Sequence, residues 1–242
     1  MEKISKAQVK LVKSLQLKKY RDELGLFVAE GEKCVSELTK AFELVHLYRE
    51  GENATRTEIE QMSGLKTPQG VIGVFRKSEY SDYSEYSELT LTLDGIQDPG
   101  NLGTIIRTCD WFGVHDIVCS LDTADCYNPK VVQATMGALA RVRLHYVDLP
   151  KWLSKQSCPI IGTLLEGKDM YDVMSSCRHD ETPTIIIMGN EGNGISQEVR
   201  KLVSLPIRIP SYPKNAETSE SLNVSIATAI VLAEFRRRSS AL

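Results

Sequence analysis

The feature that most constrains the fold is the alternation of apolar runs with helical patterns after residue 88. The run 184–188 is wholly apolar after its first residue, as in a parallel strand that is buried on both faces. Further strands are expected at 89–93, 117–120, 142–147, 159–165 and 206–209. Helices are expected at 101–112, 130–139, 149–155, 195–203 and 221–238. Strands that alternate with helices predict an α/β fold, with a parallel sheet covered by helices on both faces.

A polar, acidic stretch divides the chain. Residues 78–88 form a crude three-residue repeat of Ser, Tyr and acidic residues without an aliphatic side chain, which is typical of a linker. The preceding part has a shorter α/β pattern, with helices expected at 4–17, 30–42 and 57–62 and strands at 26–29, 44–48 and 71–75. The predicted organisation is a small domain over 1–77, a linker over 78–88 and a larger domain over 89–242.

Composition excludes several classes of protein. The chain has 242 residues, of which 42% are hydrophobic and 25% charged, as in globular proteins rather than disordered ones. No run reaches the roughly 18 apolar residues of a membrane span, and the N-terminus lacks the apolar core of a secretory signal. The six cysteines and four histidines form no C-x-x-C or H-E-x-x-H pattern. We therefore expect a cytoplasmic protein with reduced thiols, no metal and no membrane partner.

The charge is unevenly distributed. Net charge is −3, yet residues 1–77 hold 14 basic and 11 acidic side chains. Seven basic residues and one acidic residue lie within the first 21 positions. This run is either a solvated helix face or an arm that contacts phosphates. A second basic run, 236–238, lies near the C-terminus. It is either a second basic surface of the same kind or favourable charge at a helix C-terminus.

The first of three notable loops follows the strand at 89–93. Asn101 lies at an N-cap-like position after a turn rich in Pro and Gly, and Arg107 follows six positions later. Because Ile105, Ile106 and Cys109 surround it, Arg107 is expected to need a partner, which favours a functional role. The alternative interpretation is that Asn101 only caps the helix and that Arg107 is an ordinary surface residue.

The second loop, 189–194, joins the apolar strand to a helix. Its glycines do not form G-x-G-x-x-G, Ile195 stands where a phosphate loop has Lys, and Glu191 would repel phosphates. An ATP-type loop is therefore excluded. An adenosine-type ligand held by backbone groups fits the loop, and a plain turn is the alternative.

The third loop, 209–223, is long and polar and precedes an apolar helix. It ends in Ser221, Leu222 and Asn223, and either Ser221 or Asn223 is suited to cap that helix. All three loops follow the carboxyl ends of predicted strands, the edge where open α/β sheets bind ligands.

Together the three loops resemble the signature motifs of the SpoU (TrmH) family, RNA ribose 2′-O-methyltransferases of the SPOUT superfamily. The motifs are Asn101, Gly103 and Arg107, then 188–194, then 209–210 with 221–227. The resemblance covers residues 89–242. Residues 20–77 resemble the family's small substrate-binding domain, whose fold is similar to that of ribosomal protein L30e. The segments 27–31 and 67–71 carry this resemblance.

This resemblance implies a deep trefoil knot in the C-terminal domain that binds S-adenosylmethionine. The implied cofactor contacts are Gly189, Asn190, Ile209 and Leu222, with Thr163 and Leu164 lining the pocket. Arg107 matches the family's catalytic arginine. The other polar motif positions are Asn101, Glu191, Ser221 and Asn223.

The implied partners are RNA, with rRNA favoured over tRNA, and a second copy of the chain in a homodimer that completes the site. The loop between Pro210 and Ser221 is longer than is typical of the family. Two alternatives remain open. One is a non-catalytic RNA-binding or ribosome-assembly protein that retains the fold, and the other is a nucleotide-dependent enzyme with a Rossmann-like sheet.

Overall fold

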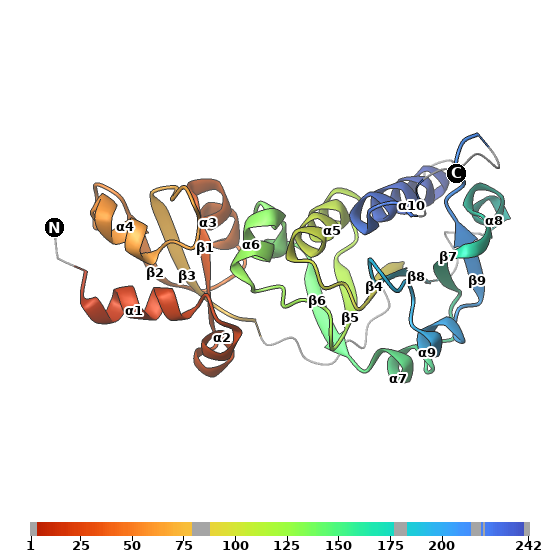
Figure 1. The fold of residues 1–242 in the computed structure, drawn as a ribbon, viewed down its shortest axis with the longest axis horizontal. Helices are drawn as coiled ribbons and strands as arrows, with labels where there is room; N and C mark the ends of the chain where they lie inside the picture. The colour runs from red at the N-terminus through yellow and green to blue at the C-terminus, as the bar shows by residue number, and fades with distance from the viewer. Residues whose placement is uncertain (1–3, 79–87, 177–182, 214–218, 220, 240–242) are drawn as a thin grey trace. The chain divides into compact units, whose positions relative to one another are not determined.

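The computed structural model describes residues 4–78, 88–176, 183–213, 219 and 221–239. The chain forms two compact units that are interleaved in sequence. The N-terminal unit comprises residues 1–79 and 125–141, and the C-terminal unit comprises residues 80–124 and 142–242. The elements of each unit are labelled in Figure 1.

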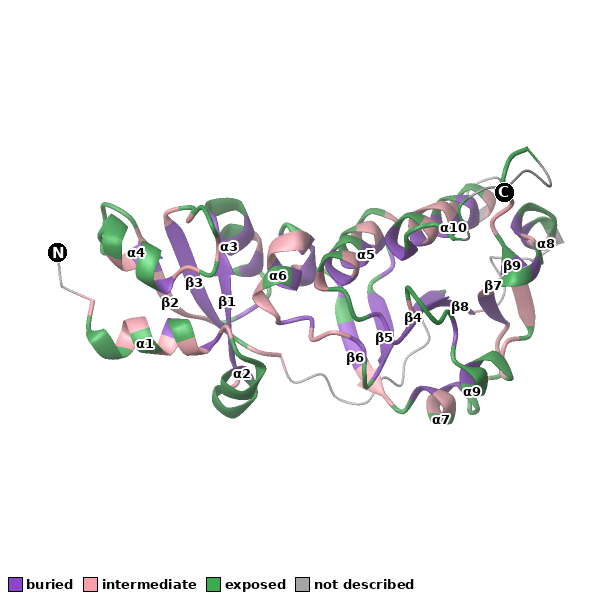
Figure 2. Ribbon diagram, in the orientation of Figure 1, coloured by how far each residue is buried: buried purple, intermediate pink, exposed green. Residues whose placement is uncertain are grey.

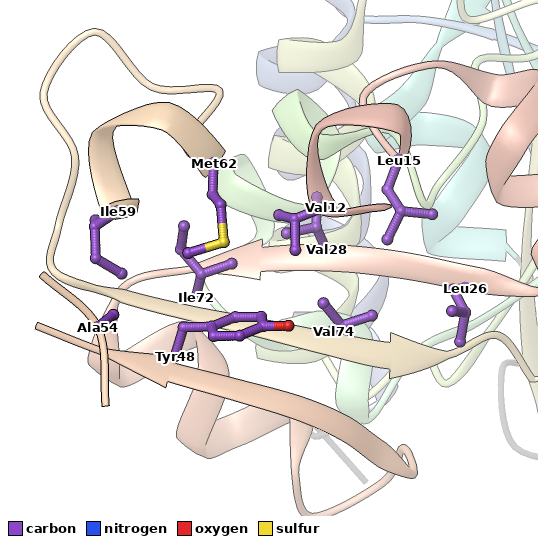
Figure 3. Packing of buried hydrophobic residues seen from close by; sticks show 10 residues of the cluster. All are labelled: Val12, Leu15, Leu26, Val28, Tyr48, Ala54, Ile59, Met62, Ile72 and Val74. Carbon is purple, nitrogen blue, oxygen red and sulfur yellow. The ribbon is translucent and has the colours of Figure 1, made fainter. Parts of the chain in front are cut away.

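A three-stranded antiparallel sheet forms the centre of the N-terminal unit, in the order β1 (Leu26–Glu30), β3 (Val71–Arg76) and β2 (Leu44–Arg49). One face is covered by α1 (Lys6–Ser14) and α4 (Arg56–Met62), both of which begin with a capping box. Figure 3 shows Val12 and Leu15 of the first helix region and Ile59 and Met62 of α4 lying over the strands. This apolar layer forms one half of the unit's core.

The opposite face is completed by a distant part of the chain. It holds α3 (Glu32–Leu38), α6 (Pro129–Thr135) and a short 3-10 helix, Ala138–Ala140. The ring of Phe27 packs against Phe42, Phe75 and Tyr127, with centroid distances of 5.1, 5.5 and 4.7 Å. Residues 125–141, which the sequence analysis assigned to the larger domain, thus contribute to the core of the N-terminal unit.

The helix predicted at 4–17 is α1, which ends at Ser14. A further helix, α2 (Lys18–Leu24), follows it and ends at Gly25, whose φ is 63°. The apolar pattern did not predict α2 because Arg21 is its buried residue, whereas Leu17 and Leu24 are exposed.

The C-terminal unit contains a six-stranded parallel sheet, which confirms the predicted α/β class. Its strands, in spatial order, are β6 (Arg143–Val147), β5 (Asp116–Ser120), β4 (Leu89–Asp94), β8 (Thr184–Gly189), β7 (Ile160–Asp169) and β9 (Leu205–Arg208). Every residue of β4, β5 and β8 is buried, as Figure 2 shows. The central strands are therefore covered on both faces, as the apolar run at 184–188 predicted.

Helices cover both faces of this sheet (Figure 1). On one face α5 (Pro99–Trp111) packs beside α10 (Val224–Ser239), and α7 (Leu149–Leu153) and α9 (Gln197–Arg200) lie on the other. The short α8 (Met170–Ser176), which the sequence did not predict, packs on β7, β9 and α10. No helix in the described part of the chain is long and apolar enough to cross a membrane.

The basic run at the end of α10 is occupied by contacts within the unit. Arg236 donates to the carbonyl oxygens of Phe112 and Gly113 and pairs with Glu88 at 3.1 Å. Arg237 and Arg238 both pair with the buried Glu234, at 2.7 and 2.8 Å. Arg236 therefore ties α10 to the end of α5 and to Glu88, whereas the ion pairs of Arg237 and Arg238 lie within α10, which favours the structural interpretation of the run.

Glu234 is expected to make the unit sensitive to acid. Hydrogen bonds from Arg237 and Arg238 lower the pKa of its carboxyl from 4.5 to about 2. Because the pKa is lower in the folded state, this stabilisation is complete above about pH 5 and is lost as the pH falls toward 2. Glu234→Gln should reduce the free energy of unfolding by about 1–3 kcal/mol at pH 7. Urea titrations should show that the difference from the wild type shrinks below pH 4. A difference that stays constant down to pH 2.5 would contradict this.

Candidate functional site

The first loop positions Asn101 in a way that the sequence analysis did not foresee. Asp98, not Asn101, caps α5, because its Oδ1 accepts from the Asn101 backbone N–H at 2.8 Å and Pro99 begins the helix. The expectation of an N-cap-like Asn101 is therefore wrong. The pair Asp98-Pro99 carried the signal for this cap. Asn101 lies inside the first turn, so its side chain is available for other contacts.

A chain of side-chain hydrogen bonds connects the three loops. Asn101 donates from Nδ2 to Oε1 of Glu191 at 3.0 Å and accepts at Oδ1 from Nδ2 of Asn223 at 2.9 Å. The three residues come from three segments far apart in sequence and meet at the carboxyl edge of the sheet. The structure therefore brings together three of the predicted polar site residues.

Both ends of this chain are tied to the backbone. The Glu191 carboxylate lies 3.4 Å from the backbone nitrogen of Asp98. Oδ1 of Asn223 accepts from the backbone nitrogen and hydroxyl of Ser225 at 2.9 and 2.6 Å, at the start of α10. Asn223 thus caps the helix and also reaches Asn101, so its two predicted roles are compatible.

The loop 189–194 is closed by its own backbone. Asn190 and Gly194 exchange two backbone hydrogen bonds of 2.9 and 3.0 Å, and the side chain of Asn190 donates to the carbonyl of Gly95 at 2.6 Å. A Cβ on Gly189 would lie 2.3 Å from the backbone of Gly194 and Ile195, so only glycine fits there. Asp94 accepts from the backbone nitrogen of Ser196 at 2.7 Å and fixes the far end of this loop. Nothing in the sequence pattern singled out Asp94.

The remaining predicted cofactor contacts lie around the same edge. Thr163 stands where the pairing of β7 with β9 shifts register, and its hydroxyl donates to the Ile187 carbonyl at 3.2 Å. Leu164 and Ile209 are half-buried, whereas Ser221 and Leu222 are exposed. Much of the longer loop, 214–218 and 220, lies outside the described residues.

Arg107 faces solvent. Its neighbours Ile105, Ile106 and Cys109 are fully buried, but no described residue pairs with its guanidinium. The expectation that its apolar neighbours would force a partner is therefore wrong, since the helix turns Arg107 away from them. An exposed guanidinium at this position is free to meet an anion outside the chain.

The residues at this edge fit an adenosine-type cofactor without phosphates. Leu165 is 59% exposed and Leu222 48% exposed, which leaves apolar surface for a heterocycle. Glu191 brings negative charge, which suits a positively charged sulfonium and disfavours a triphosphate. The side chains at this edge therefore suit S-adenosylmethionine better than ATP.

Comparison with known proteins identifies the family. The SpoU rRNA Methylase family matches residues 88–233, and the MRM3-like substrate binding domain matches residues 6–57. The chain belongs to the SpoU rRNA methylase family. The prediction of an RNA methyltransferase is therefore confirmed, and the N-terminal part matches a small substrate-binding domain.

Individual relatives of this SpoU protein support the same conclusion. It is 28% identical to the 23S rRNA (guanosine(2553)-2′-O)-methyltransferase RlmP of Bacillus subtilis over 98% of both chains. It is 35% identical to the 23S rRNA (guanosine-2′-O-)-methyltransferase RlmB of Pseudomonas syringae over 72% of this chain and 68% of that one. An AdoMet-bound rRNA methyltransferase from Sinorhizobium meliloti is 30% identical with a TM-score of 0.84, over 98% and 97% of the two chains. The cofactor in that structure is the one that the sequence analysis predicted.

Proposed function

We propose that this protein methylates a ribose 2′-hydroxyl in ribosomal RNA with S-adenosylmethionine as the donor. The observation that carries the proposal is the hydrogen-bonded chain of Glu191, Asn101 and Asn223, which joins the three motif loops beside the expected cofactor contacts. Guanosine is the favoured nucleotide because RlmP and RlmB are both named for it. We place the protein in the cytoplasm, with its RNA.

Arg107 is the proposed catalytic group. Bound S-adenosylmethionine supplies an activated methyl group, and the 2′-hydroxyl must lose its proton as it attacks. Because the pKa of a guanidinium is about 12 or more, neutral arginine is too scarce to be an efficient base. Arg107 instead binds the adjacent phosphate and stabilises the charge that develops on the 2′-oxygen. Asn101 and Glu191 align the reacting groups around Arg107, and Ser221 and Asn223 lie at the rim of the site.

The protein is proposed to act as a homodimer through the face formed by α5 and α10. Trp111 is 86% exposed and lies one helical turn beyond Arg107 on α5, and Ile226 on α10 is 52% exposed. A second copy that covers these apolar side chains would lie next to Arg107 and complete the site.

A trefoil knot is proposed for the C-terminal segment. β9 pairs with β7 at the edge of the sheet, yet Asn223 reaches Asn101 beside the central strand β4. This distance across the sheet between β9 and Asn223 supports the knot. The N-terminal unit, residues 1–79 together with 125–141, is proposed as the L30e-like RNA-binding domain.

Calorimetric titration tests the proposal directly. S-adenosylmethionine and S-adenosylhomocysteine should bind with micromolar dissociation constants, whereas NAD and ATP should not bind. A radiolabelled methyl group should then appear as 2′-O-methyl nucleotide in an unmodified large-subunit rRNA transcript. Donor binding without transfer to any rRNA would point to a non-catalytic relative, and binding of NAD or ATP would overturn the proposal.

A further inference from the structure

The helix α1 carries a row of lysines on its solvent side. Lys6, Lys10 and Lys13 are all exposed, and because they lie four and three positions apart they share one face of the helix. The row extends over about 10 Å along the helix axis. Val12 and Leu15 lie on the opposite side, where they pack over the sheet (Figure 3). The three ammonium groups therefore form a continuous basic surface on one unit.

These lysines have no acidic partner among the described residues. Other basic side chains of the N-terminal unit differ in this respect, because Lys18 pairs with Asp22 and each arginine of the unit forms an ion pair. The arginine pairs are Arg21 with Asp125, Arg49 with Glu32, Arg56 with Glu50, Arg76 with Glu43 and Arg141 with Glu37. The row on α1 thus keeps its charge for a partner outside the chain.

The position of the row is unfavourable for the helix itself. Lys6 begins α1, where the positive end of the helix dipole disfavours a cation, and the first turn has no acidic residue. The neighbouring helices α3 and α4 have Glu32 and Glu58 in their first turns. Lys6 and Lys10 are also like charges one turn apart, which destabilises a helix. Helix stability therefore does not explain this row, in contrast to the paired arginines of α10.

We propose that Lys6, Lys10 and Lys13 bind the phosphate backbone of the substrate RNA. A lysine ammonium is a point charge that contacts phosphates without reading the bases. The chain as a whole has a net charge of −3, so its overall field does not attract RNA. At physiological salt, exposed charges act over only about 8 Å, so a local row of cations must supply the attraction.

Of the two interpretations of the basic N-terminal run, the phosphate-contacting one is therefore favoured. The row precedes residues 20–77, the part that resembles an L30e-like domain, and so adds a binding surface to that part. The choice of ribosomal RNA as the partner rests on the proposed function.

The test combines Lys6→Gln, Lys10→Gln and Lys13→Gln in the full chain. Fluorescence anisotropy measures the affinity for a large-subunit rRNA transcript between about 50 and 200 mM salt. The triple variant should bind at least about tenfold more weakly at about 100 mM salt. The slope of log K against log salt should become shallower by about 2 to 3, because each lost phosphate contact removes about 0.7 to 0.9. The unfolding temperature should not fall, since the row does not stabilise α1.

Two further variants separate the effect of the row from that of charge in general. The matched control replaces exposed lysines of the C-terminal unit and changes the net charge equally, with Lys151→Gln, Lys155→Gln and Lys201→Gln. It should leave both the affinity and the slope as in the wild type. Replacement of the three lysines of the row by arginine keeps the charge and should retain the affinity. With RNA saturating, the single-turnover methylation rate of the glutamine variant of the row should stay within about twofold of the wild-type rate, because the row only binds.

Unchanged affinity and slope in the glutamine variant of the row would overturn this inference alone, as would an equal loss in the control. An unrelated RNA of the same length should lose affinity by the same factor. A loss confined to the rRNA transcript would show base reading and overturn the assignment to the backbone. A wild-type protein that binds the transcript through these lysines but methylates no RNA would instead overturn the proposed function.

Discussion

Arg107→Ala should slow methyl transfer to RNA at least about 100-fold, the effect typical of removing one group that stabilises developing charge. Because Arg107 is exposed and unpaired among the described residues, its removal leaves no buried group without a partner. The unfolding temperature should therefore not change. The affinity for S-adenosylmethionine should stay within a few-fold, since the guanidinium acts on the RNA and not on the cofactor.

Single-turnover methylation and calorimetry on the same preparation check this expectation. Arg107→Lys keeps the charge but loses the forked donors, so it should recover only part of the rate. Lys151→Ala, an exposed cation on α7 at the other face of the sheet, is the matched control and should have no effect. Full activity of Arg107→Ala would remove this residue from the mechanism.

Deletion of residues 1–77 should damage the fold of the remaining chain. It uncovers the buried side chains of Tyr127, Val131, Val132 and Leu139, which pack within the N-terminal unit. Exposed apolar patches of this kind promote aggregation. If residues 125–141 are also replaced by a Gly/Ser linker of equal length, the C-terminal unit should fold and bind S-adenosylmethionine. Its methylation of rRNA should fall at least about 100-fold, because the RNA-binding unit is absent.

Light scattering, thermal unfolding and calorimetry on the two shortened proteins distinguish these outcomes. The simple deletion is expected to aggregate, and the double replacement is expected to stay monodisperse. Equal solubility of the two would show that residues 125–141 do not depend on the N-terminal unit. Undiminished methylation by the double replacement would show that this unit does not recruit RNA.

The regular fold was largely readable from apolar periodicity. Every strand of both sheets was expected within a few residues, since the central strands have continuous apolar runs and the others are bounded by turn residues. The helix α2 was missed because its buried residue is Arg21, and burial of a charge through distant partners cannot be read from local pattern. Membership of 125–141 in the N-terminal unit was missed because periodicity carries no information on which sheet a helix covers.

The three motif loops of the site were predictable from the sequence, but their internal geometry was not. Asn101, Glu191 and Asn223 were named from their motifs, and the structure joins them directly. The cap at Asp98 and the exposure of Arg107 depend on where α5 begins and which way it turns. Asp94 was missed because its carboxylate contacts the backbone nitrogen of Ser196, which lies far away in the sequence.

The aromatic cluster of Phe27, Phe42, Phe75 and Tyr127 has a consequence for the order of events during translation. The strands β1, β2 and β3 leave the ribosome first, but Tyr127 and α6 are synthesised only after β4, α5 and β5. Domains usually fold as units from the N-terminus as they emerge. Here the first unit cannot close its core until residues 80–124, the first segment of the second unit, have been made. A pause in elongation before Tyr127 would therefore leave the rings of Phe27 and Phe42 uncovered and available to chaperones.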